Sequence, residues 1–109
     1  MAKATYWQRG ESLDYKNNTD AVIEENTVIA IGTRIGITGT YLNPGEIGSL
    51  HVCGIYEIPK TDETAIALGA AVYFDGAGIT VTADGNTPAG YAAAAATEAD
   101  TTILVKLLG

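Results

Sequence analysis

The stretch that decides the fold is Ser49-Leu50-His51-Val52-Cys53-Gly54-Ile55-Tyr56-Glu57-Ile58, the longest β-branched and aromatic run in the chain. Successive side chains of a strand point to opposite faces. One face then carries Leu50, Val52, Tyr56 and Ile58, and the other carries His51, Cys53, Ile55 and Glu57. Both faces are partly apolar, which is typical of a strand inside a sandwich or in contact with a neighbour.

Shorter runs of the same character flank this stretch, and turn residues separate them at intervals of about 8–12 positions. These runs cover residues 28–31, 34–38, 72–75, 79–82 and 102–108. The closing run is again apolar on both sides. The pattern predicts an all-β protein, a small compact sandwich or barrel.

Local chemistry specifies several of the breaks. Asn-Pro-Gly at 43–45 fits a type II turn, and Asp-Gly at 75–76 and 84–85 favours tight hairpin turns. Residues 64–69 fit either one helical turn or a loop. Tyr91 and the five alanines after it are too few for a stable helix, so we predict a strand with small side chains over 91–96. No internal repeat is visible.

A chain of 109 residues is expected to form one domain. We predict an extended N-terminal arm over residues 1–10 and a single β domain over residues 11–109. Ala, Gly and Thr fill 44 of the 109 positions, so the core carries little apolar area. Small proteins with so light a core are usually stabilised by crosslinks or by association, and we therefore expect self-association.

The formal net charge of −7 argues against nucleic acid and against an anionic membrane surface as partners, because both require Lys and Arg. No run approaches the ~18 apolar residues of a spanning helix, and the first residues lack the apolar stretch of a signal peptide. A single cysteine excludes an internal disulfide framework. We expect a soluble protein made in the cytosol.

Catalytic and metal-binding patterns are weak. His51 and Cys53, two residues apart on one strand, would stand about 7 Å apart, beyond hydrogen-bond reach. We expect a half-buried cysteine and a structural histidine. The acidic pairs lack the spacing of a calcium loop, and the glycines lack a phosphate-binding fingerprint. The sequence predicts no enzyme, no cofactor and no metal site.

The aromatic residues indicate contact surfaces, since Tyr and Trp are enriched at protein interfaces. Tyr6 and Trp7 lie in the predicted arm, which has no hydrophobic periodicity and also carries Arg9. Large aromatic side chains there require a surface to dock on. Tyr41, beside the 43–45 turn, is a further candidate. We predict contacts with another subunit or a larger partner at Tyr6, Trp7, Arg9 and Tyr41, and docking on the protein's own domain is the alternative for Tyr6 and Trp7.

Several short turn-and-strand stretches, in order along nearly the whole chain, resemble the phage capsid cement or decoration family. These stretches are 44–50, 52–60, 68–75, 85–92 and 105–109. The resemblance implies a compact β fold without an active site. It also implies homotrimers at local three-fold positions on the outer surface of the virion capsid, bound to the major capsid protein and stabilising the shell. Cys53 and the alanines at 92–96 have no counterpart that we can link to this role.

An alternative class fits the same composition: a bacterial β-sandwich module that binds a glycan or a cell-surface ligand. Such a module would use exposed aromatic rings for stacking, and Tyr41 is the best candidate for that role.

Overall fold

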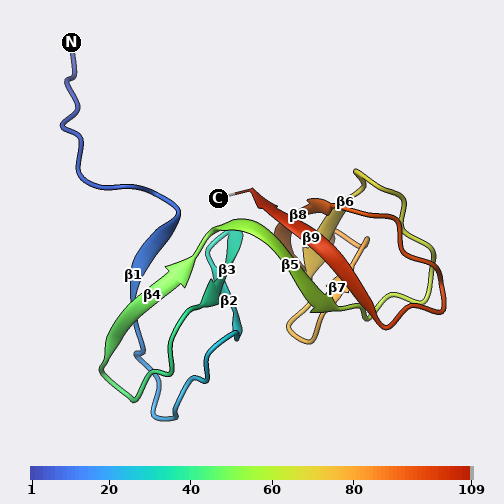
Figure 1. Cartoon of the computed structure of the whole chain (residues 1–109), viewed down its shortest axis with the longest axis horizontal. Helices are drawn as coiled ribbons and strands as arrows, with labels where there is room; N and C mark the ends of the chain where they lie inside the picture. The colour runs from blue at the N-terminus through green and yellow to red at the C-terminus, as the bar shows by residue number, and fades with distance from the viewer. Residues whose placement is uncertain (109) are drawn as a thin grey trace.

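The computed structural model describes residues 1–108 and contains only strands, turns and loops in that part of the chain. The strands are β1 (Ser12–Lys16), β2 (Val28–Ile31), β3 (Arg34–Thr38), β4 (Ile47–His51), β5 (Cys53–Pro59), β6 (Ala71–Phe74), β7 (Ile79–Thr80), β8 (Thr87–Ala92) and β9 (Thr102–Leu108). They form two antiparallel sheets, ordered β1-β4-β3-β2 and β5-β9-β8-β6-β7, which lie side by side (Figure 1). The prediction of a compact all-β fold is confirmed.

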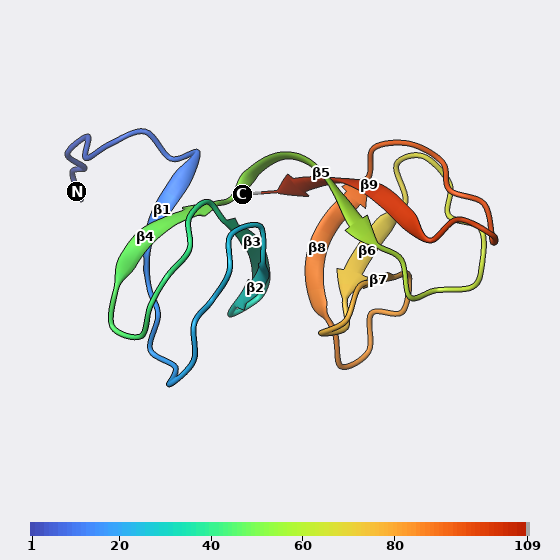
Figure 2. The same ribbon diagram turned by 60° about the horizontal axis from the view of Figure 1, so that its bottom comes forward.

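The long strand predicted over 49–58 is wrong as a single element. Strand β4 ends at His51 in the first sheet, and β5 begins at Cys53 in the second. Between them the Val52 amide donates to the Glu11 carbonyl at 3.0 Å, and Gly54 adopts a φ of 114°. Figure 2 shows this stretch crossing from one sheet to the other. The chain changes sheets here because a positive φ bends the backbone where only glycine fits readily.

Three further expectations need correction. A strand was predicted over 91–96, but β8 ends at Ala92, Ala93 and Ala94 form a bend, and Ala96 makes an isolated bridge with Ile66. Strand β1 was not predicted at all, and β7 is shorter than the run 79–82. The Asp84-Gly85 turn does not close a hairpin, because β6 lies between β7 and β8. Residues 64–69 form a loop.

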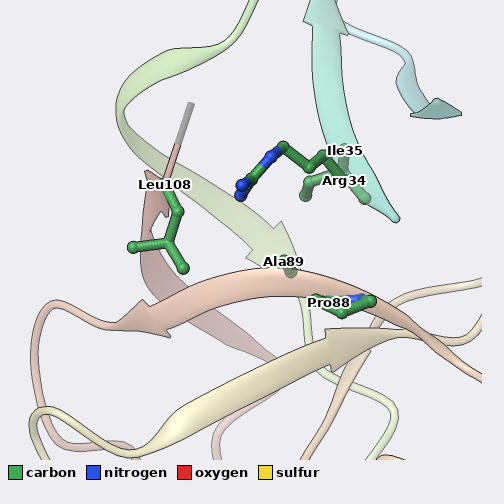
Figure 3. Close-up of a pocket in the computed structure, with 5 residues that line it drawn as sticks. All are labelled: Arg34, Ile35, Pro88, Ala89 and Leu108. Carbon is green, nitrogen blue, oxygen red and sulfur yellow. The ribbon is translucent and has the colours of Figure 1, made fainter. Parts of the chain in front are cut away.

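The main core lies between the second sheet and the inner side of β3. Its fully buried members are Ile35, Ile37, Ile58, Ile66, Val72, Ile79, Ala89, Ala92, Ala96, Ile103, Val105 and Leu107. Figure 3 shows the junction of β3 with β8 and β9, where Arg34 and Ile35 face Pro88 and Ala89. The void there measures about 10 Å³, room for about one water molecule. The two sheets therefore pack closely at this junction.

The two halves of the chain repeat one four-stranded unit, contrary to the expectation of no internal repeat. Strands β1, β2, β3 and β4 occupy the same sheet positions as β5, β6, β8 and β9, and β7 is an addition to the second half. The turn at Asn43–Glu46, closed by the Glu46 amide on the Asn43 carbonyl at 3.0 Å, is matched by one at residues 97–100, closed by the Asp100 amide on the Thr97 carbonyl at 3.1 Å. Gly45 has a φ of 85°, as the predicted type II turn at 43–45 requires, and the matched residues Asn26 and Gly69 both have a positive φ, of 62° and 85°.

The backbone hydrogen bonds of the two halves match as well. In the first half they are Ile23 N to Leu42 O, Asn26 N to Thr38 O and Thr38 N to Thr27 O; in the second they are Ile66 N to Ala96 O, Gly69 N to Ala92 O and Ala92 N to Ala70 O. Strand β3 also packs on its own counterpart, β8. The two halves thus meet through equivalent strands.

The prediction of an arm over residues 1–10 and one domain over 11–109 stays a prediction. Residues 1–10 lie outside both sheets and are exposed, and Figure 1 shows them leading away from β1. Gly109, the last residue of that range and of the stretch 105–109, lies outside the described residues. No helix among the described residues is long and apolar enough to span a membrane.

Candidate interaction surfaces

The aromatic residues of the predicted arm are open to solvent. Trp7 is 87% exposed and Tyr6 is 80% exposed. Arg9 pairs with Glu11 at 3.0 Å, and both side chains are largely exposed, so this ion pair adds little stability. The side chains of this segment are therefore available to bind another surface.

Tyr41 does not join these residues in one surface. It is 57% exposed and lies in the loop between β3 and β4, where the neighbouring side chains of Thr40 and Leu42 lie over Gly48, next to Ile47, which pairs with Lys16. Residues 1–10 precede Ser12, at the other end of β1, which pairs with His51. Five strand residues separate the two places by about 13 Å. The predicted contact residues thus form two separate surfaces.

His51 and Cys53 belong to different sheets and have different surroundings. His51 is half-buried over Gly39, where an added Cβ would lie 2.6 Å from the imidazole Nε2. Cys53 was expected to be half-buried, but it is exposed. The prediction of a half-buried Cys53 is wrong, because this residue lies on the outer side of β5, which is an edge strand.

A cleft of about 180 Å³ opens between the first sheet and the free edge of β5. Its lining is Asn26, Val28, Ile37, Tyr56, Glu57, Ile58 and Pro59. Most of these side chains are apolar. The cleft can therefore accept an apolar side chain from another surface.

Asp62 organises the loop between β5 and β6. Its carboxylate accepts hydrogen bonds from the Thr64 hydroxyl at 2.5 Å, the Thr64 amide at 2.9 Å, and the Thr80 hydroxyl and Val81 amide at 3.0 Å each. These donors, the Thr64 hydroxyl first, hold the pKa of Asp62 well below its usual range. Asp75 is similar: hydrogen bonds from the Thr61 hydroxyl and from the amides of Ala77 and Gly78 lower its pKa. Each carboxylate therefore holds its own loop in place through hydrogen bonds, Asp62 the loop after β5 and Asp75 the turn between β6 and β7.

We expect Asp62→Asn to lower stability by about 1–2 kcal/mol near neutral pH, because a neutral amide accepts these bonds less strongly. The pKa of the folded carboxylate lies below the unfolded value of about 4, so its contribution is present above pH 4 and is lost as the pH falls further. Thermal unfolding from pH 7 to pH 2.5 should therefore bring the two melting temperatures together. Asp84→Asn, in an exposed turn, is the control and should match the wild type throughout. A constant difference for Asp62→Asn would contradict this assignment.

No group of three or more His, Cys, Asp or Glu side chains within residues 1–108 is placed to hold a metal ion.

Fold and surfaces together define a small all-β protein of two repeated antiparallel units with exposed aromatic and apolar side chains. The family model described as phage cement protein matches residues 7–107, nearly the whole chain. The chain belongs to the phage cement protein family. No curated protein and no solved structure shows significant similarity to it.

Family membership confirms the resemblance noted from the sequence. The protein is a structural component of the phage capsid that stabilises the shell, and it associates with the capsid of the virion.

Proposed function

We propose that the protein binds the outer surface of an assembled phage head as a homotrimer. There it contacts the major capsid protein and stabilises the shell, after synthesis in the host cytoplasm. The observation that carries the proposal is the family match over residues 7–107. The light core, with Ala, Gly and Thr at 44 of 109 positions, supports association, and the net charge of −7 favours solubility of an exterior protein. This role is that of a binding protein without catalysis.

Contact with the shell runs through residues 1–10, with Tyr6 and Trp7 as anchors and Arg9 beside them. Three observations support this assignment. The segment lies outside both sheets, its aromatic side chains are exposed, and Lys3 and Arg9 make it basic in an acidic chain. Tyr41, at the other end of β1, forms a second and smaller contact.

The direct test is cosedimentation with expanded heads that lack the protein, together with sedimentation equilibrium of the free protein. We expect saturable binding to heads and a trimer at micromolar concentration. Absence of binding to heads would overturn the proposed function. A free monomer that still binds heads would overturn only the preformed trimer.

Trp7→Ala should weaken binding to heads about thirtyfold, because truncation of an interface anchor costs about 2 kcal/mol. The melting temperature should barely change, since Trp7 contributes nothing to the core. Leu68→Ala, which removes an exposed apolar side chain from the second half, is the control and should bind normally. Normal affinity of Trp7→Ala would move the shell contact to the loops around Tyr41 and Asp62.

A further inference from the structure

The outer side of β5 and β9 is apolar although nothing within residues 1–108 covers it. Its side chains come from cross-strand pairs: Cys53 with Leu108, Ile55 with Lys106, and Glu57 with Leu104. We call these six residues the outer face. Ile55 is 59% exposed, Leu108 is 56% exposed and Leu104 is 41% exposed, whereas the alternate residues of β9 are buried. Lys106 lies over the ring of Tyr91 on the adjacent strand, 5.8 Å from its centroid.

The repeated fold supplies an internal comparison for this face. Strands β1 and β4 are the counterparts of β5 and β9, and their outer side also faces solvent. It carries the pairs Ser12 with His51, Asp14 with Ser49, and Lys16 with Ile47. Five of these six side chains are polar, as expected for a sheet face in water. The outer side of the edge pair of strands is thus mainly polar in the first half, on β1 and β4, and mainly apolar in the second half, on β5 and β9.

Charge indicates what covers the outer face. The chain carries 13 acidic residues against 6 basic ones, so most of its surface repels a second copy. The outer face has one acid, Glu57, and one base, Lys106, so two copies can approach there without net repulsion. Glu57 also lines the cleft beside β5, so Lys106 on the outer face of one copy can pair with Glu57 at the cleft of the next, which gives the contact a specific orientation.

In a ring of three copies, each copy contacts the next through two different patches. Such a contact is called heterologous, and the ring closes when each copy is rotated by one third of a turn from the last. The cleft at the free edge of β5 is the neighbouring concave patch, and Glu57 contributes to its lining as well as to the outer face. We infer that the outer face of β5 and β9 is the subunit interface of the homotrimer, with its apolar side chains seated against the cleft of the next copy. This inference rests on the proposed trimer and names the surface that forms it.

The test compares Ile55→Lys with Ile47→Lys by sedimentation equilibrium at micromolar concentration. Each variant places the same charge at an exposed isoleucine on a strand, one on the outer face and the other on its counterpart in the first half. We expect Ile55→Lys to shift the protein to monomers while Ile47→Lys sediments as the wild type. Both should keep the wild-type circular dichroism spectrum. Ile47→Lys should also keep the wild-type melting temperature, whereas Ile55→Lys should melt at a lower temperature because the monomer lacks the stabilisation that association gives.

Charge exchange tests the orientation. Glu57→Lys and Lys106→Glu should each weaken association at least tenfold, and the double variant should recover most of it. Cys53, the single thiol of the chain, gives an independent readout. Its reaction with a maleimide should slow as the protein associates, and Ile55→Lys should restore fast labelling.

The outcomes separate this inference from the proposed function. A wild type that stays monomeric, or an Ile55→Lys variant that associates normally, overturns the interface, while binding to heads still supports the capsid role. If Ile55→Lys associates normally but loses affinity for heads, the shell covers the outer face, and the inference is wrong. Loss of head binding by every variant and by the wild type overturns the proposed function itself.

Discussion

Gly90→Ala is expected to abolish folding. Gly90 lies in β8 opposite Leu107 of β9, with a φ of 137° that residues with a side chain rarely adopt. An added Cβ would lie 2.0 Å from the Lys106 carbonyl oxygen, which belongs to the paired backbone and cannot move aside. Steric overlap and backbone strain together exceed about 4 kcal/mol, a large part of the stability of a protein of this size.

Circular dichroism and the soluble yield of the purified variant would measure this effect. Gly85→Ala is the matched control, because Gly85 also has a positive φ, of 76°, but has open space around it. That variant should fold and lose only about 1–2 kcal/mol. A Gly90→Ala protein that melts near the wild-type temperature would show that β8 and β9 do not approach as described.

Asn17→Ala should lower stability by about 3 kcal/mol, which corresponds to a fall in Tm of roughly 10–20 °C. Asn17 is 1% exposed, and both the donor nitrogen and the acceptor oxygen of its side-chain amide make two hydrogen bonds each. Its Nδ2 donates to the carbonyls of Ala21 at 2.8 Å and Leu42 at 3.1 Å, and its Oδ1 accepts from the Thr19 amide and hydroxyl. Alanine would remove all four of these hydrogen bonds and leave a cavity at a buried position.

The measurement is thermal or urea unfolding of Asn17→Ala beside Asn18→Ala, whose side chain is exposed. The control should change stability by less than about 0.5 kcal/mol. Equal effects at the two positions would contradict the bonding assigned to Asn17. In the sequence, two adjacent asparagines indicate only a turn, and nothing distinguishes the buried one from the exposed one.

Predictions of individual strands succeeded where β-branched residues are dense. Strands β2, β3 and β9 have the bounds expected from the runs 28–31, 34–38 and 102–108. Strand β1, Ser-Leu-Asp-Tyr-Lys, has no β-branched residue and forms only because β4 pairs with it. Strand β8 begins with Thr-Pro-Ala-Gly, which has a single β-branched residue. In both strands tertiary pairing overrides a weak local preference.

The internal repeat was invisible because its two halves share hydrogen bonds rather than residues. The turns at Asn43–Glu46 and at residues 97–100 are closed by the same backbone hydrogen bond but share no residue at matching positions. The added β7 also shifts the spacing of the second half. Backbone geometry can repeat in this way because backbone hydrogen bonds are the same for every residue type except proline.

Among the candidate contact residues, the sequence identified exposed aromatic side chains, and the fold separated them. Tyr6 and Trp7 lie at one end of β1 and Tyr41 lies at the other. The sequence also showed that the runs 49–58 and 102–108 are apolar on both faces. Which of these faces is left uncovered depends on the packing of the two sheets, which no local pattern contains.

The sequence by itself determined that this protein is all-β and where several of its turns lie. Strand propensity and turn chemistry depend on residues close together in the chain, so both can be predicted from the sequence. Only the tertiary structure decided that the run 49–58 divides between two sheets, that Asn17 is buried, and that the outer face of β5 and β9 is open. These features arise from contacts between residues far apart in sequence, whose free energy depends on the whole packed arrangement.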